Sequence, residues 1–189
     1  LPIYFRDIIH ANDWQTALTP VYYSAMYANS PGYENIKTIF TIHNIQYQGV
    51  YGKELLEDVL GIPADKASLL EYDGCINFMK GAIECADKVT TVSPSYADEI
   101  LDPWYSHGLD SILTERRYKL SGILNGIDTV GYDPATDKCI KANFSADDVS
   151  GKKIDKKALQ KEMGLPVKPG VPVIGMGLPS DTASESGVV

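Results

Sequence analysis

The segment Thr38–Gly49 (TIFTIHNIQYQG) decides the expected fold of this chain. Its first half is a run of β-branched and aromatic residues, which is typical of a strand buried in a sheet, and it ends on a histidine followed by amides. In open α/β sheets, ligands bind just beyond the carboxyl ends of the strands. His43 is therefore placed for a ligand rather than for the core, with Gly49 following where the chain can turn.

Strands and helices alternate outward from this segment. We expect strands over residues 7–11, 36–43, 88–92 and 120–124, and helices over residues 14–27, 54–60, 75–86, 94–101, 109–117 and 156–163. This alternation predicts βαβ units, and hence an α/β fold with a Rossmann-like parallel sheet and helices on both faces. A further strand over residues 171–176 would be the first of a new domain.

Bulk composition excludes several classes of partner. The chain has 189 residues, 44% of them apolar, which is enough for a globular core. Its 17 basic and 25 acidic side chains give a net charge of −8 without any basic run, so neither nucleic acid nor an anionic membrane is an expected partner. No apolar run is long enough to span a membrane. We read the three scattered cysteines as reduced, which favours the cytoplasm.

Four polar residues stand at or just past the carboxyl ends of the expected strands. They are Asp13, His43, Ser93 and Asn125. A doubly wound sheet brings such positions to one edge, together with the N-termini of the following helices. A carboxylate, an imidazole, an amide and helix-end N–H groups together suit a polyhydroxylated, phosphorylated ligand.

Each of these residues also has a purely structural interpretation. Asp13 can be the N-cap of the next helix, and His43 can be a buried histidine with its hydrogen bonds satisfied. Ser93 before a proline is more often a helix cap than a catalyst, and Asn125 followed by glycine can be a simple turn. Position alone leaves these alternatives open.

Several motifs together resemble the bacterial glycogen synthase and plant starch synthase family. The first is His10–Leu18 (HANDWQTAL), and His43–Gly49 (HNIQYQG) is the second. Asn77–Gly81 with Ala86–Tyr96 is similar to the third. The series is completed by Gly108–Asp110, Leu124–Asp128 and Asp133–Asp137, and it extends over most of the chain.

The resemblance implies a two-domain GT-B glycosyltransferase with its site in the cleft between the domains. It implies transfer of glucose from ADP-glucose to the non-reducing end of an α-1,4-glucan such as glycogen, with retention and without a metal or other cofactor. By this resemblance Asp13 and His43 are the expected catalytic residues. The expected substrate-binding residues are Asn125, Asn44, Gln48 and Tyr47. The location would be the bacterial cytoplasm, or a plastid for a plant protein.

The resemblance also predicts how the chain is organised. Residues 1–137 would be a partial N-terminal domain that lacks its first strands, residues 138–170 a linker with a helix, and residues 171–189 the divergent start of a second domain. The family's Lys-Thr-Gly-Gly-Leu loop is absent, and Leu178–Asp181 replaces cations that neutralise the diphosphate. We therefore expect a fragment with little activity of its own.

Three other functions compete with this one. A non-catalytic glucan-binding domain would use surface aromatics such as Trp104, Tyr105, Tyr47, Tyr51 and Tyr72 to stack on sugars. A related transferase would use a UDP-sugar or act on sucrose. A dinucleotide-binding oxidoreductase would need Gly-x-Gly-x-x-Gly after its first strand, and the sequence has none.

Overall fold

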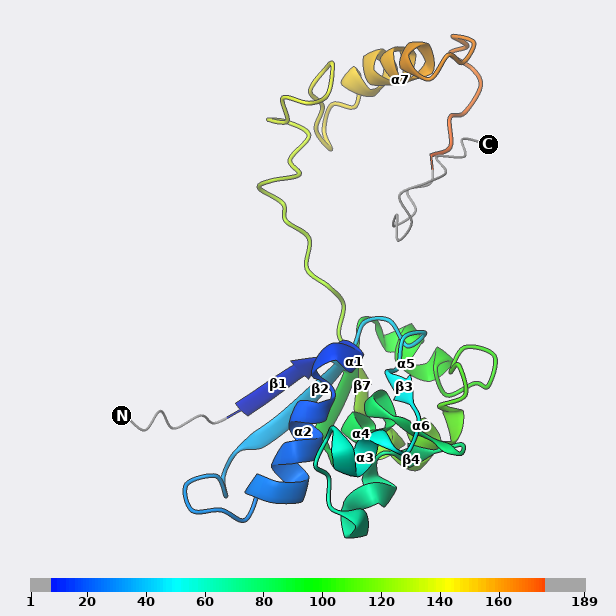
Figure 1. Ribbon diagram of the computed structural model, residues 1–189. Helices are drawn as coiled ribbons and strands as arrows, with labels where there is room; N and C mark the ends of the chain where they lie inside the picture. Colours follow the sequence, from blue (N-terminus) through cyan, green and yellow to red (C-terminus); the bar gives the residue numbers. More distant parts are fainter. Residues whose placement is uncertain (1–7, 176–189) are drawn as a thin grey trace. The chain divides into compact units, whose positions relative to one another are not determined.

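The computed structural model describes residues 8–175 (Figure 1). Contacts within the chain divide it between Gly126 and Ile127 into two compact units, which we describe separately. The predicted domain limits at residues 137 and 170 stay a prediction.

A parallel sheet of four strands forms the centre of the first unit. Its strands, in spatial order, are β1 (Ile8–Asn12), β2 (Lys37–Ile42), β6 (Lys88–Thr91) and β7 (Leu120–Gly122). All three neighbouring pairs are parallel. The α/β fold predicted from the sequence is confirmed, and the four strands predicted between residues 7 and 124 form within two residues of their expected limits. The carboxyl ends of all four strands therefore meet at one edge of the sheet, which we call the carboxyl edge.

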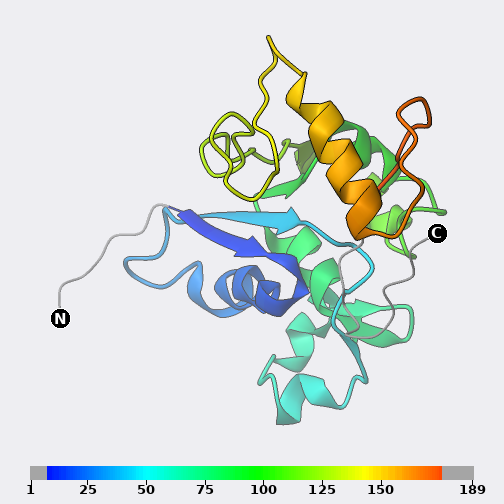
Figure 2. The same ribbon diagram turned by 90° about the horizontal axis from the view of Figure 1, so that it is seen from above.

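Short helices connect these strands. They are α1 (Asp13–Thr16), α2 (Leu18–Tyr22), the π-helix η1 (Tyr23–Tyr27), α4 (Phe78–Cys85), α5 (Pro94–Glu99), α6 (Asp110–Glu115) and the 3₁₀ helix η3 (Arg117–Lys119). Figure 2 shows α2 and α4 on the same side of β1 and β2. The continuous helix predicted over residues 14–27 is instead interrupted at Ala17. Pro20 follows closely and has no N–H to continue the helical hydrogen bonds.

The core lies between the sheet and these helices. Phe40 and Ile42 of β2 are fully buried, as are Met79 and Ile83 of α4. Gly81 lets α4 approach its neighbours closely, because a Cβ there would lie 2.5 Å from a methyl of Leu70 and 2.9 Å from one of Val21. Burial of this apolar surface is the main force that holds the unit together.

A second, antiparallel sheet was not expected from the sequence. Its strands are β3 (Val50–Tyr51), β5 (Cys75–Asn77) and β4 (Glu71–Tyr72), with β5 in the middle. Near them lie α3 (Leu55–Asp58) and the 3₁₀ helix η2 (Ala64–Leu69). The helix predicted over residues 75–86 therefore starts three residues late. Its first residues pair with β3 and β4, and Asn77 caps α4 by accepting a hydrogen bond from the Lys80 N–H.

The second unit contains one helix within its described residues, α7 (Gly151–Glu162). It begins five residues before the predicted start at residue 156. The strand predicted over residues 171–176 does not form in residues 171–175, and Met176 lies outside the described residues. A strand needs a neighbour to hydrogen-bond with, whereas here the Lys156 ammonium donates to the carbonyls of Pro169 and Val171. Among the helices of residues 8–175, none has the length and apolarity that crossing a membrane requires.

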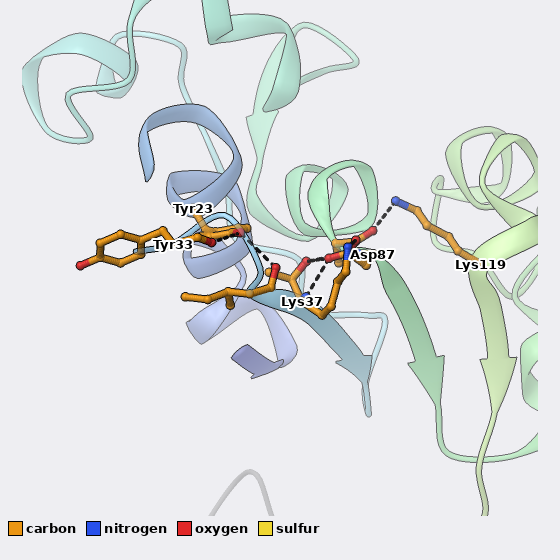
Figure 3. A network of polar contacts seen from close by, with 8 residues as sticks. Tyr23, Tyr33, Lys37, Asp87 and Lys119 are labelled. Atoms are coloured by element: carbon orange, nitrogen blue, oxygen red, sulfur yellow. Dashed lines mark hydrogen bonds and ion pairs between the residues drawn. The ribbon is translucent and has the colours of Figure 1, made fainter. Parts of the chain in front are cut away.

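A polar network ties the sheet together at the ends opposite the carboxyl edge (Figure 3). The N–H and hydroxyl of Thr38 both donate to one carboxylate oxygen of Asp87, at 2.8 and 2.9 Å, and the Asp87 N–H donates back to that hydroxyl. Lys37 adds an ion pair at 3.5 Å. Beside it, the Lys119 ammonium donates to the last carbonyls of α4, at Glu84 and Ala86. These bonds join β2 to the turn between α4 and β6, and η3 to the end of α4.

This network predicts a pH-dependent contribution to stability. Burial alone would raise the pKa of Asp87, but the hydrogen bonds from Thr38 and the charge of Lys37 outweigh burial and lower it. A lowered pKa means that the unfolded chain takes up the proton first, so Asp87 stabilises the fold above an unfolded carboxyl pKa of about 3.9 and loses this effect as pH falls. Since 41% of its side-chain surface stays exposed, we expect Asp87→Asn to cost about 1 kcal/mol at neutral pH.

Urea unfolding of both proteins across the acidic range measures this effect. The gap between them should close as the pH drops through the carboxyl range. Asp98→Asn is the matched control, because the Asp98–Arg117 pair is 74% and 66% exposed and should contribute little. A gap that persists at the lowest pH would contradict the assignment to the Asp87 charge.

Candidate functional site

The predicted polar residues all follow strands of the parallel sheet. Asp13 comes directly after β1 and His43 directly after β2. Ser93 comes two residues after β6, and Asn125 comes three residues after β7. The parallel pairing places all four along the carboxyl edge, where α/β sheets bind their ligands.

Asp13 joins the ends of β1 and β2. Its Oδ1 accepts hydrogen bonds from the backbone N–H of His43 at 2.8 Å and of Asn44 at 3.2 Å. Its own backbone has a φ of 53°, in the left-handed region that non-glycine residues rarely adopt and that often marks functional positions. The interpretation of Asp13 as an N-cap is wrong, because Asn12 occupies that position and makes no capping bond with its side chain. The carboxylate instead shapes the loop after β2.

The His43 imidazole is exposed at this edge rather than buried, so the alternative of a satisfied core histidine is wrong. Its Nε2 lies 3.0 Å from Oδ1 of Asn12, the last residue of β1. Asn12 and Asp13 thus hold the ring and the backbone of the same histidine. Asn12 was not among the predicted site residues, although it lies at the end of a strand and within the HANDWQTAL motif.

Residues 43–49 form a loop, which we call the His43 loop, and its last residue packs against the start of α4. Asn44 accepts the Gln46 N–H with its side-chain oxygen at 3.0 Å, which closes a turn typical of asparagine. Gly49 has a φ of +68°, and a Cβ there would lie 2.8 Å from the Trp14 indole and 2.9 Å from the Phe78 ring. Only glycine fits this position, which explains the end of the HNIQYQG motif. Tyr47 remains 49% exposed at the surface of the loop.

Gln48 binds three parts of the chain to one another. Its Nε2 donates to the carbonyls of Ile45 at 3.1 Å and His107 at 3.0 Å, and its Oε1 accepts from the Asn77 amide at 2.6 Å. Both of its N–H donors are therefore used within the protein. Gln48 therefore braces the His43 loop against Asn77 and His107, and its predicted role as a substrate-binding residue stays a prediction.

Ser93 and Asn125 differ in how firmly they are held. The Ser93 hydroxyl accepts the Tyr96 N–H at 3.0 Å, so it is the N-cap of α5 and its structural interpretation is confirmed. Asn125 is exposed, and its side chain makes no hydrogen bond within residues 8–175. The structure thus links Asp13, His43 and Asn44 by direct bonds, and shows no such bond from Asn125 to them.

Tyr96 is the partly buried phenol on α5. Burial is the main cause that raises the pKa of Tyr96, and the negative charges of Glu99 and Asp13 add to it. The phenol therefore stays protonated at neutral pH, as a hydrogen-bond donor.

Within residues 8–175, no three histidine, cysteine, aspartate or glutamate side chains gather as metal ligands would.

Comparison with known proteins identifies the family. A family model described as the starch synthase catalytic domain matches residues 2–115. The chain belongs to this family. The glycogen synthase of Desulforamulus reducens is 46% identical over 172 residues, which are 90% of this chain and 36% of that protein. The glycogen synthase of Lactiplantibacillus plantarum is 47% identical over 176 residues, or 92% of this chain and 36% of that one.

A solved structure of a starch synthase is similar to this chain. The catalytic domain of Starch Synthase IV from Arabidopsis thaliana, bound to ADP and acarbose, matches with a TM-score of 0.70 and 40% identity. The match covers 85% of this chain and 33% of that one. The chain spans about 36% of the length of the curated relatives it matches.

Proposed function

We propose that this chain supplies the sugar-facing half of a glycosyltransferase site that moves glucose from ADP-glucose to the non-reducing end of an α-1,4-glucan, with retention. One observation carries the proposal. At the carboxyl edge, Asp13 holds the two N–H groups of the His43 loop, and the His43 ring lies exposed beside Asn12. Family membership supports the reaction class, and the geometry supports where the sugar binds.

The chemistry of transfer fits these groups. The bond between the anomeric carbon and the diphosphate breaks, and a bond forms from that carbon to an acceptor hydroxyl, whose proton is taken up by the departing diphosphate. The sugar passes through an oxocarbenium-like state, so the protein must orient hydroxyls and stabilise charge. His43 can accept a bond from a sugar hydroxyl, and Asn125, Asn44 and Tyr47 can donate to sugar oxygens. Asp13 is assigned to fix this arrangement rather than to attack the sugar.

We further propose that the reaction needs no metal ion, as the family resemblance implies, so that chelation by EDTA should leave it unchanged. The curated relatives named above are bacterial, which favours the bacterial cytoplasm over a plastid as the place of action.

A chimera tests the function directly. Residues 8–126 of this chain would replace the aligned segment of the Desulforamulus reducens glycogen synthase, and incorporation of labelled glucose into glycogen would be measured. We expect transfer from ADP-glucose in preference to UDP-glucose. A folded chimera that incorporates no labelled glucose would contradict the proposal. The 189-residue chain alone should transfer little.

A glucan-binding module is the second candidate, and one loop favours it. Trp104 is 84% exposed and Tyr105 49% exposed, on a loop over residues 102–108. The loop is nevertheless well fixed. The Trp104 N–H donates to the Asp102 side chain at 2.8 Å, and Gln48 holds the His107 carbonyl. A large indole presented on a fixed loop can stack on a sugar ring.

This loop predicts a measurable loss of binding. Trp104→Ala should weaken binding of maltoheptaose by about fivefold, because aromatic stacking contributes about 1 kcal/mol. Isothermal titration or affinity electrophoresis on the whole chain measures this. Tyr118→Ala is the matched control, since Tyr118 is another aromatic with 77% exposure. Equal affinity in the Trp104 variant and wild type would remove the loop from the glucan site.

A further inference from the structure

Asn12 lies where it can control the chemistry of His43. It is the last residue of β1, its backbone pairs with Thr41 of β2, and its side chain is exposed at the carboxyl edge. Its Oδ1 lies 3.0 Å from the His43 Nε2. The backbone of His43 is fixed separately by Asp13. The ring orientation thus depends on Asn12, and the ring position depends on Asp13.

This contact sets which ring nitrogen carries the proton. An amide oxygen only accepts hydrogen bonds, so Nε2 must donate, and the neutral ring then has its lone pair on Nδ1. The opposite amide orientation would make Asn12 the donor and would require the Nδ1–H form. Within residues 8–175 no group bonds to Nδ1, so this nitrogen is the one left for a ligand.

We infer that Asn12 is a positioning residue that holds His43 in its neutral Nε2–H form and leaves Nδ1 as an acceptor for a sugar hydroxyl. The His43–Asn12 arrangement is independent of any reaction, and only the identity of the hydroxyl rests on the proposed function. His43 then recognises a hydroxyl by accepting its proton in a hydrogen bond. It does not act as a proton donor to the leaving group.

Asn12→Asp in the full 189-residue chain gives the sharpest test. The substitution keeps the shape and the acceptor oxygen but places a negative charge beside Nε2. An ionised carboxylate only accepts hydrogen bonds, so the proton of the neutral His43 ring should stay on Nε2 in this variant. Long-range ¹H–¹⁵N spectra report the tautomer of each of the three histidines. His43→Gln assigns the signal.

The other histidines are internal controls. His107 lies on the loop over residues 102–108, and its spectrum should not respond to the Asn12 substitutions. The ring of His10 bonds the Thr41 hydroxyl at 2.7 Å, and its spectrum should respond much less than that of His43. Asn12→Ala should increase the Nδ1–H population of His43. A wild-type spectrum with the His43 proton on Nδ1, or an Asn12→Ala variant whose Nδ1–H population equals that of wild type, would overturn the inference. Neither measurement uses a sugar nucleotide, so either result is independent of the proposed reaction.

Discussion

Replacing Gly122 by alanine should destabilise the fold by about 3 kcal/mol, because the added methyl has no space. A Cβ at Gly122 would collide with the carbonyl of Ser93 and the nitrogen of Pro94. These are backbone atoms at the start of α5, so no side-chain rotation can relieve the collision. Either β7 or the capped end of α5 must move, and both border the carboxyl edge.

Urea unfolding of the chain measures this change. Gly126→Ala is a close control, since a Cβ at Gly126 meets nothing within 4 Å, and it should change stability by less than about 0.5 kcal/mol. If Gly122→Ala unfolds at the same urea concentration as wild type, then β7 and α5 do not pack as described.

Replacing His43 by alanine should lower kcat of the chimeric synthase by about a hundredfold, the scale seen when one preorganised hydrogen-bonding group at a reacting centre is removed. The ring is exposed and its backbone is held by Asp13 rather than by ring contacts. The fold should therefore survive the change, and the loss should fall on kcat more than on KM, because hydroxyl orientation matters most in the transition state.

Steady-state kinetics with ADP-glucose and glycogen measure this loss. His107→Asn is the control, because His107 has a φ of 50° and asparagine tolerates that backbone conformation. It should retain activity near wild type. If His43→Ala keeps more than about a tenth of the activity, the ring does not stabilise the reacting sugar.

The central strands were predictable because the signal for them is local. The run before His43 is β-branched and aromatic and is followed by polar residues, so β2 could be located from the sequence together with the residue that ends it. Parallel pairing then fixed which positions share an edge, without any knowledge of side-chain contacts. The carboxyl edge, with Asp13, His43, Ser93 and Asn125 along it, followed from these two facts.

Features that depend on distant residues were not predictable. Residues 75–77 have helical periodicity, yet they form β5 because β3 and β4 offer hydrogen-bonding partners from other parts of the chain. Asp13 has the sequence position of a helix cap, yet its carboxylate binds N–H groups thirty residues away. Gln48 lies in a loop that was predicted to bind substrate, and nothing in the sequence indicated that its side chain donates to the carbonyl of His107. In each case a tertiary contact outweighed the local preference.

The expected strand over residues 171–176 is a case in which the local sequence predicted an element that does not form among the described residues. Its valine-rich sequence has strand propensity, but no neighbouring strand pairs with residues 171–175 among the described residues. Propensity describes how well a side chain fits a sheet surface, and it does not create the sheet. The assignment of this region to a second domain stays a prediction.

A ¹H–¹⁵N titration of the ¹⁵N-labelled chain with maltoheptaose and ADP-glucose tests most directly whether the carboxyl edge binds the sugar. The backbone N–H groups of His43 and Asn44, which Asp13 holds, report on that edge. We predict that their signals and that of Asp13 shift first and furthest. Shifts confined to the 350 Å³ cavity between α4 and α6, lined by Lys80, Glu84 and Arg116 among others, with none at these three residues, would contradict the proposed site.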